Sequence, residues 1–422
     1  MLSCGETLVW RSERGAPAVP FIECARHIPY VLEVSGSLDV AALSAAVDAL
    51  AARHPMLRAS YDAEGGRLIR PPAAGLLRHV DLIDVGQGGR TAIAHDVVRD
   101  EVNAPFDLTT GVCRALLVRA DRDRHLLALT VHHIVFDAWS RQVVARDLHG
   151  LYGAASGAAA PPPLAASYQE YVAFERTNLD GPALDSDREF WLRRFDGLAD
   201  VRIAPDVAAP AGDSPTAGRR SFTIDRESAE RLRAAGRRHG ATLAVTTLAV
   251  FALVIHEMTD VNDVAIGIPM ADRPRRRFEG VVGLMMNALT LRSERPDRGF
   301  GALVRATARE FSNAYDHRQL PFAHLVDLLR RHGAGAGVPF RVLLNFVKEA
   351  PAGVGLPGLE SATVAVVVDS PSAADLSLHV LDARDGLRGV LVYRRDRFSA
   401  HRAAECVERF EGAVRRVLAQ PD

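Results

Sequence analysis

Hydrophobic and polar positions along the chain predict a succession of strands and helices. The clearest stretch is the uninterrupted apolar run from Leu126 to Val131, which has the length of a buried strand. Beyond it the hydrophobic positions recur at roughly helical spacing, at Val143, Val144, Leu148 and Leu151. We therefore expect a strand to end and a helix to begin near Asp137 or Ala138.

The stretches before this run follow the same logic. Ile28 to Val34 reads as a strand, and a helix capped by Asp39 follows, with one apolar face formed by Val40, Leu43, Val47 and Leu50. A further strand from Val112 to Val118 is separated from the central run by the polar residues 121–124. Such a short polar connection predicts an antiparallel hairpin.

A stretch rich in alanine, glycine and proline, residues 153–166, predicts an exposed connector. Later segments predict a helix over 187–195, a strand over 220–224, a helix over 228–238, a buried apolar helix over 241–255 and a strand from Asp263 into a tight loop. Because 422 residues exceed one ordinary core, we expect two lobes, 1–178 and 179–422.

Two adjacent histidines, His132 and His133, end the central apolar run. Neighbouring side chains of a strand point to opposite faces, so we expect one histidine to face a core and the other a cavity. A neutral imidazole at such a place is suited to receive a proton near neutral pH. Diverging histidines without a third ligand argue against zinc. From the residues alone, two buried structural histidines remain an equal alternative.

The run HHIVFDA, residues 132–138, resembles the HHxxxDG motif of nonribosomal peptide synthetase condensation domains, within the wider chloramphenicol-acetyltransferase-like acyltransferases. Ala138 stands where that family has glycine. The following Trp139 and Ser140 match the order "GWS" of condensation domains, which favours bond formation over epimerisation.

Other landmarks of this family occur once each and in order along nearly the whole chain. They are residues 3–10 (SxAQxRLW), 53–61 (RHExLRTxF), 168–174 (YxDYAxW), 263–273 (VxxGxPxxGR), 282–292 (IGxFVNTLxLR) and 317–326 (HQDLPFEKLV). Departures occur at Gly5, Glu6, Leu8 and Val9 in the first landmark and at Asp272 in the fourth. Leu8 removes the usual arginine, a bidentate donor that could brace the site.

The resemblance implies an α+β fold of two chloramphenicol-acetyltransferase-like lobes, with mixed sheets and flanking helices, in a V-shaped pseudo-dimer with the active site in a tunnel between them. It implies that His133 is catalytic, as general base or positioning group. Support of the site would come from His132, Asp137 and Arg273, with an ion pair between the last two. The tunnel would be lined by Ala138, Trp139, Ser140 and Asn287.

The activity implied is acyl transfer, in which an acceptor amine or hydroxyl attacks a thioester to form an amide or ester. Because no GxSxG-like elbow is visible, we expect direct attack rather than a covalent acyl-enzyme. Substrates would arrive on the phosphopantetheine of peptidyl or acyl carrier proteins, with a small amine or alcohol as a further acceptor, and without a bound cofactor or metal. Two alternatives are a coenzyme A-dependent acyltransferase and a catalytically silent recruitment domain.

Composition changes this picture little. A formal net charge of -1 gives no electrostatic reason to expect nucleic acid. The apolar residues 241–255 fall short of a membrane span. Cys4, Cys24, Cys113 and Cys406 are too scattered for a disulfide or metal framework and read as free thiols. We expect a cytoplasmic monomer, either an excised domain or, as we favour, a free-standing enzyme.

Overall fold

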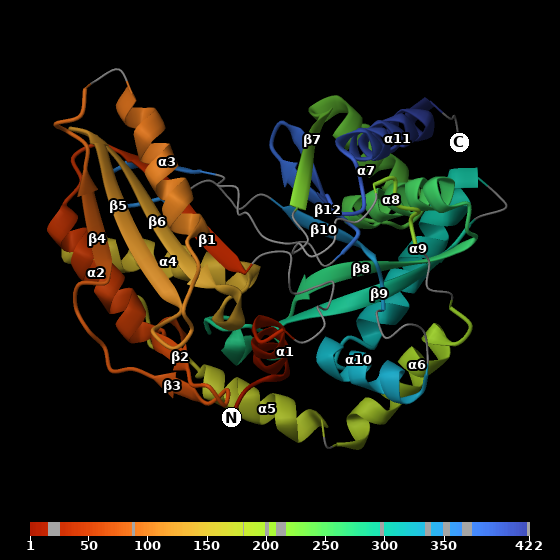
Figure 1. The fold of residues 1–422 in the computed structure, drawn as a ribbon, viewed down its shortest axis with the longest axis horizontal. Helices are drawn as coiled ribbons and strands as arrows, with labels where there is room; N and C mark the ends of the chain where they lie inside the picture. Colours follow the sequence, from red (N-terminus) through yellow and green to blue (C-terminus); the bar gives the residue numbers. More distant parts are fainter. Residues whose placement is uncertain are drawn as a thin grey trace.

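The structure is a computed structural model that describes residues 1–15, 26–86, 89–179, 181–198, 202–207, 217–295, 299–333, 339–348, 355–364 and 374–419. Two sheets, each with helices packed against it, form two halves set at an angle to each other (Figure 1). This is the α+β, two-lobed architecture that the sequence predicts. Cys24 lies outside the described residues.

The first sheet has the strand order β11-β1-β6-β5-β4. Its strands are β1 (His27–Ser35), β4 (Leu77–Asp81), β5 (Cys113–Asp121), β6 (Arg124–His132) and β11 (Glu360–Thr363). β5 and β6 pair antiparallel, with Leu117 opposite Leu127, so the predicted hairpin is confirmed.

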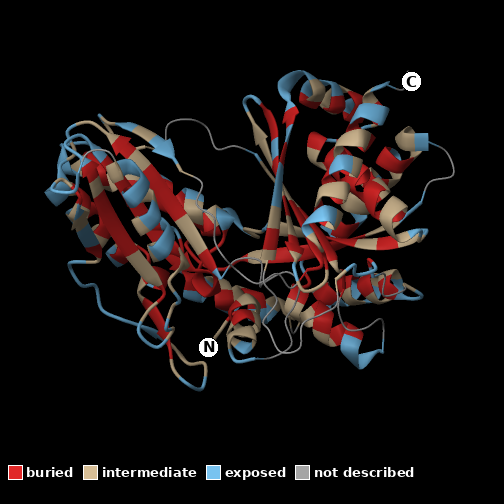
Figure 2. Cartoon of the chain, turned by 45° about the horizontal axis from the view of Figure 1, so that its top comes forward, coloured by how far each residue is buried: buried red, intermediate tan, exposed pale blue. Residues whose placement is uncertain are grey.

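Both faces of this sheet are covered, because α2 (Val40–Arg53) and α4 (Ala138–Ala155) lie on one side and α3 (Arg90–Asn103) on the other. Successive residues of β6 alternate between the two sides. Leu127 and Leu129 belong to the cluster that contains α2 and α4, whereas Leu126 and Ala128 pack with α3. Because helices cover both faces, β6 is buried along almost its whole length, and the strands of this sheet are largely in the colour of buried residues in Figure 2.

The second sheet has the strand order β7-β13-β12-β10-β8-β9 and mixes parallel with antiparallel pairs. Its strands are β7 (Ala217–Asp225), β8 (Asp263–Ala271), β9 (Met286–Glu294), β10 (Val342–Lys348), β12 (Leu376–Ala383) and β13 (Gly386–Arg394). The helices beside it are α7 (Arg226–Arg238), α8 (Leu243–Thr259), α9 (Gly299–Asp316) and α11 (Ala400–Ala419).

α8 is the buried apolar helix predicted from residues 241–255, with residues such as Phe251 and Ala252 completely inaccessible. Among the described helices, none is by itself both long and apolar enough to cross a membrane. Only α7 and α8 taken together pass that test, as a pair bent by 95°.

The two halves are joined by short helices rather than by one linker. α1 (Cys4–Glu13) lies between them, and α5 (Tyr168–Leu179), α6 (Asp185–Phe195) and α10 (Phe322–Arg331) run along their base (Figure 1). β2 (Ala59–Tyr61) and β3 (Arg67–Ile69) form a small hairpin near α1.

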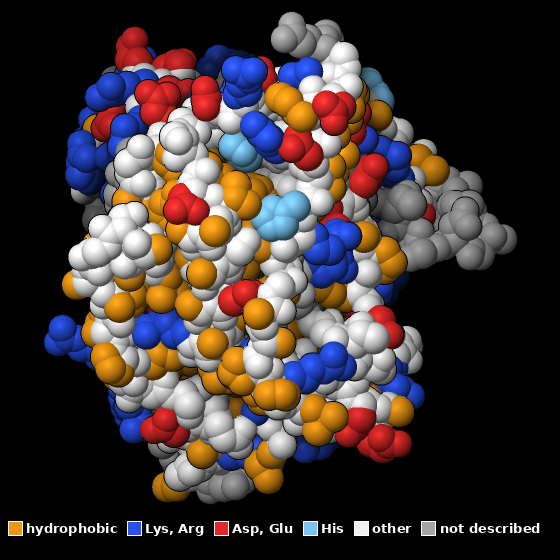
Figure 3. All heavy atoms as spheres, turned by 90° about the vertical axis from the view of Figure 1, so that its left-hand side faces the viewer, with side chains coloured by type: hydrophobic (Ala, Val, Ile, Leu, Met, Phe, Trp, Pro, Cys, Tyr) orange, Lys and Arg blue, Asp and Glu red, His pale blue; other side chains and the backbone are white. Residues whose placement is uncertain are grey.

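The first sheet includes a strand from the far end of the chain. β11 pairs antiparallel with β1, with Leu32 opposite Thr363. Residues on the C-terminal side of the expected boundary thus complete the N-terminal sheet, and the boundary near residue 178 itself stays a prediction. The outer face of this half carries basic and acidic side chains interspersed among apolar ones (Figure 3).

Candidate active site

The strand β6 ends at His132, and His133 begins a single 3-10 turn, His133–Val135. This differs from the sequence expectation, in which both histidines belong to the strand. His132 closes the turn, because its Nδ1 accepts a hydrogen bond of 3.1 Å from the Ile134 N–H. The turn, rather than strand alternation, sends the two imidazoles in different directions.

His132 is buried in a small aromatic and ionic cluster. Its ring centroid lies 6.0 Å from that of His27 and 5.7 Å from that of Phe106. Its Nε2 lies 3.5 Å from the Glu13 carboxylate. His132 therefore supports the end of the strand from within the first half of the molecule.

His133 is oriented by its own turn. Its Nδ1 lies 2.6 Å from the Phe136 carbonyl oxygen. A carbonyl can only accept, so Nδ1 carries the proton and the Nε2 lone pair is left available. Burial lowers the pKa of His133, outweighing the Phe136 hydrogen bond and the charge of Asp137. The ring is therefore neutral at neutral pH.

Asp137 forms no hydrogen bond to His133 and instead joins three elements. It caps α4 by accepting from the Ser140 N–H at 2.7 Å, and it accepts from the Met285 N–H at 3.0 Å. Arg273 donates to its two oxygens at 2.9 and 3.0 Å. Burial acts to raise the pKa of Asp137, but Arg273 and these hydrogen bonds outweigh burial and hold the pKa below its ordinary value.

Ser140 extends this junction across the two halves. Its hydroxyl donates to the Gly283 carbonyl at 2.9 Å and accepts from Gly283 N–H and from Arg273. The indole N–H of Trp139 donates to the Glu279 carbonyl at 2.8 Å. Ala138 is exposed at the first position of α4.

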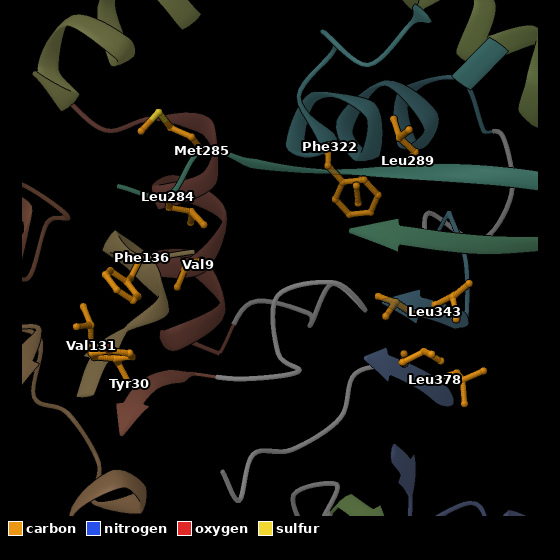
Figure 4. Packing of buried hydrophobic residues seen from close by; sticks show 14 of the residues in the cluster. Val9, Tyr30, Val131, Phe136, Leu284, Met285, Leu289, Phe322, Leu343 and Leu378 are labelled. Atoms are coloured by element: carbon orange, nitrogen blue, oxygen red, sulfur yellow. The ribbon is translucent and has the colours of Figure 1, made fainter. Parts of the chain in front are cut away.

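A cavity that is open to solvent lies beside His133. Its walls come from α1, α5, the residues that follow β8, the start of β9 and residues 318–323. Four of its apolar wall residues are seen at close range in Figure 4, namely Val9, Leu284, Met285 and Phe322. α1 packs tightly here, since a side chain at Gly5 would come within 3.1 Å of Leu284.

Of the four residues expected to line a tunnel, Asn287 lines this cavity, whereas Ala138, Trp139 and Ser140 do not. Asn287 makes four hydrogen bonds to backbone groups: its amide donates to Arg318 and Leu320 carbonyls, and its oxygen accepts from Ala288 and Phe322 N–H groups. These bonds hold residues 318–322 against β9. Substrate contact by the four residues stays a prediction.

Several polar residues of the cavity were not expected from the sequence, among them Cys4, Glu175 and Asp272. Glu175 accepts from the Cys4 N–H at 2.8 Å and from the Tyr171 hydroxyl at 3.2 Å. Burial, with the neighbouring Glu175 charge, raises the pKa of the Cys4 thiol far above its usual range. The sequence contained little indication of these residues, because among the three only Asp272 departs from the family pattern at a named position.

The described residues contain no cluster of three or more histidine, cysteine, aspartate or glutamate side chains able to hold a metal ion. Cys4, Cys113 and Cys406 are free thiols, as expected.

Comparison with known proteins decides the family. A family model described as "Condensation domain" matches residues 24–422. The chain belongs to the condensation domain family. A curated relative from the linear gramicidin synthase of Brevibacillus parabrevis is 29% identical over 413 residues, which cover 94% of this chain and 8% of that protein. This condensation domain therefore corresponds to a small part of the length of that synthase protein.

Solved structures of similar proteins cover the whole chain. SgcC5 of Streptomyces globisporus has a TM-score of 0.85 and 25% identity, over 100% of this chain and 99% of its own. The X-domain from teicoplanin biosynthesis has a TM-score of 0.84 and 26% identity, over 100% of this chain and 95% of its own. The X-domain has also been solved in complex with OxyB.

Proposed function

We propose that this condensation domain transfers an acyl or aminoacyl group from a carrier-protein thioester to an acceptor amine or hydroxyl, forming an amide or an ester. The observation that carries the proposal is His133, whose Nδ1 is fixed by the Phe136 carbonyl while the ring lines the cavity. The relation to a peptide synthase supports a thioester donor carried on phosphopantetheine. The residues 318–322 and the start of β9 form the opposite wall.

In the proposed step the acceptor nitrogen or oxygen attacks the thioester carbonyl carbon. His133 Nε2 holds the attacking group in line and takes the proton that it loses. The carbon–sulfur bond breaks, and the imidazolium returns the proton to the departing thiolate, which leaves as a thiol. An amine needs this proton transfer less than a hydroxyl does, because the amine is the stronger nucleophile and its adduct sheds the proton readily.

The cavity supports direct attack rather than an acyl-enzyme. Cys4 is a cysteine of the cavity wall, and the raised pKa of its thiol leaves the thiolate essentially unpopulated at neutral pH. A thiol is a poor nucleophile compared with its thiolate. His133 thus acts on the acceptor itself.

Asp137, Arg273 and Asn287 are assigned positioning roles in this proposal. Four donors form hydrogen bonds to the Asp137 carboxylate. The carboxylate therefore holds the start of α4 to the second half. Asn287 is likewise committed to backbone groups. Their substitution would displace His133 relative to the opposite wall instead of removing a reacting group.

The deciding experiment incubates the protein with a loaded carrier donor and a series of amines and alcohols, followed by mass spectrometry of the products. His133→Ala is expected to lower turnover with an alcohol by about 10²- to 10⁴-fold and with an amine by less. His79→Ala, which removes an exposed histidine of β4, is the matched control and should leave turnover unchanged. Equal turnover of the wild type and His133→Ala would contradict the role of His133.

Two other functions remain as alternatives with distinct outcomes. Equal rates with a coenzyme A thioester and with the carrier-bound donor would favour a coenzyme A-dependent acyltransferase. A recruitment function is favoured by the similar X-domain, which has been solved in complex with OxyB. In that case no donor and acceptor pair yields a product that depends on His133.

A further inference from the structure

The cavity beside His133 has an acidic wall formed by two segments distant in sequence. Glu175 comes from α5 and is 9% exposed, while Asp272 follows β8. The Asp272 backbone is held on both sides, since its N–H donates to the Met285 carbonyl and its carbonyl accepts from Arg273. The two acidic residues therefore line one cavity from different elements.

Neither carboxylate forms an ion pair with a described side chain. Glu175 is hydrogen-bonded by the Cys4 N–H, the Cys4 thiol and the Tyr171 hydroxyl, which are neutral donors. Arg318, the one basic residue among the described residues of the wall, donates to the Tyr315 carbonyl at 3.0 Å and lies 4.1 Å over the Tyr315 ring. Burial raises the pKa of Asp272, and the positive charges of Arg318 and Arg273 offset this effect only in part and without an ion pair.

An independent observation at the same place indicates a ligand. His133 is 8% exposed and lines the same cavity. Its Nδ1 is occupied by the Phe136 carbonyl, and no described residue donates a hydrogen bond to its Nε2, which is therefore open to a ligand. The two acidic residues and His133 line one cavity.

Building on the proposed acyl transfer, we propose that this cavity selects a substrate with a second, cationic group, an ammonium or guanidinium, which Glu175 and Asp272 bind while His133 receives the reacting group. The chemistry corresponds to a diamine or to a basic amino acid. A buried carboxylate is stabilised most by a partner of opposite charge that also donates hydrogen bonds to it. Burial raises the pKa of both acids because it disfavours their charged forms. A bound cation would offset this penalty.

The first test measures binding without turnover. The whole chain is titrated calorimetrically with 1,4-diaminobutane and with 4-amino-1-butanol, which has the same length and one ammonium. The diamine is expected to bind at least about tenfold more tightly, because its second ammonium gains a charge-assisted hydrogen bond to a carboxylate. Equal affinities for the two compounds would overturn the proposal.

Two variants assign this preference to the acidic wall. Glu175→Gln and Asp272→Asn are each expected to weaken diamine binding by about ten- to a hundredfold while leaving 4-amino-1-butanol less affected. Asp272 makes no ion pair that its replacement would break, so this variant remains informative if Glu175→Gln fails to fold. The matched control is Glu189→Gln on α6, where the side chain is 71% exposed, and it should bind as the wild type does.

Turnover identifies which substrate brings the cation. One arm offers diamine and monoamine acceptors to a neutral carrier-bound donor, and the other offers basic and neutral donors to a monoamine. A preference of at least about tenfold in one arm, lost in Asp272→Asn, supports the proposal and names the source. Product formation without any such preference, together with unchanged diamine binding in both variants, overturns the proposal and leaves acyl transfer intact. Carboxylate-dependent diamine binding without product from any pair supports the cation site and counts against acyl transfer.

Discussion

At the scale of single residues, the site depends on how two neighbouring histidines are separated. His132 ends a strand and stays inside the first half, while His133 is turned into the cavity by a 3-10 turn. The same turn brings the Phe136 carbonyl onto Nδ1, so a backbone group orients this ring as a carboxylate orients the histidine of a catalytic triad. Asp137, four residues on, is left to hold the backbone.

The pH dependence of turnover should report the state of His133. Its pKa lies below the ordinary value of 6.5 because of burial, so the ring stays neutral as the pH falls below 6.5. With an alcohol acceptor, whose own ionisation does not intervene, kcat/KM should hold through pH 6.5 and decline only at lower pH, as the ring protonates. An acid limb centred at or above pH 6.5 would contradict the burial argument.

Ala138 is the residue at which we expect the acceptor range to respond. It occupies the first position of α4, where the family has glycine, and it is exposed. The family resemblance implies that substrate passes this position, where a methyl group takes more room than glycine, so Ala138→Gly should change the relative turnover of bulky and small acceptors. Its effect on the free energy of unfolding should stay within about 1 kcal/mol. An unchanged acceptor profile would count against this role.

At the scale of elements, the start of α4 is fastened to the second half by a buried ion pair. Asp137 and Arg273 are 0% and 2% exposed at the side chain. Removing one member leaves a buried charge without its partner, whereas removing both does not. The junction should therefore respond more strongly to a single substitution than to the pair.

Arg273→Met should lower the free energy of unfolding by about 3–5 kcal/mol, measured by urea denaturation. Adding Asp137→Asn should cost less than the sum of the two single effects. Arg193→Met, which removes an exposed i,i+4 partner of Glu189, is the control and should change stability by about 0.5 kcal/mol or less. Strict additivity would show that the pair does not act as one unit.

α1 carries a second buried ion pair that the family pattern does not anticipate. Glu6 stands where the family has glutamine, and it is completely buried. It caps its own helix with Ser3 and accepts from the Tyr61 hydroxyl at 2.7 Å and from Arg67 at 2.6 and 2.7 Å. These contacts attach α1 to the small hairpin of β2 and β3.

Restoring the family residue should therefore harm this protein. Glu6→Gln leaves Arg67, 5% exposed at the side chain, without a counter-charge, and should cost about 3–5 kcal/mol in the free energy of unfolding. Combining it with Arg67→Met should recover part of that loss, as followed by denaturant titration. A neutral Glu6→Gln would mean that water already solvates Arg67.

At the scale of the whole molecule, local sequence patterns predicted individual helices and strands well. They did not predict which residues from distant segments meet in the fold. The hairpin of β5 and β6, the helix start near Asp137 and the buried α8 follow from residues adjacent in sequence. The acidic wall does not, because Glu175 and Asp272 reach one cavity only through the fold, in which Tyr171 and Phe174 of α5 pack against Phe278. β11 escaped prediction for the same reason, since its partner β1 lies more than 300 residues away.

Stability at acidic pH is a property of the whole molecule, because several buried histidines contribute to the free energy of unfolding. Burial lowers the pKa of His27 to about 4 and also lowers the pKa of His133 and His256. In the unfolded chain these rings protonate near pH 6.5, so the unfolded state binds more protons as the pH falls from about 6.5 towards the folded values. The free energy of unfolding should therefore decrease over this window, by up to about 1.4 kcal/mol per pH unit for each such ring.

The acids Glu175 and Asp272 act in the opposite direction, because burial raises their pKa and their folded forms take up protons first. Their gain is complete only when the pH reaches the ordinary carboxyl values near 4, whereas the histidine rings of the unfolded chain protonate near pH 6.5, so the loss from the histidines should dominate between pH 6.5 and 5.5. Denaturation at these two pH values should show a smaller loss for His27→Gln than for the wild type, while the exposed-site variant His79→Gln should match the wild type. An unchanged loss in His27→Gln would show that the His27 ring is already protonated in the folded protein at pH 5.5.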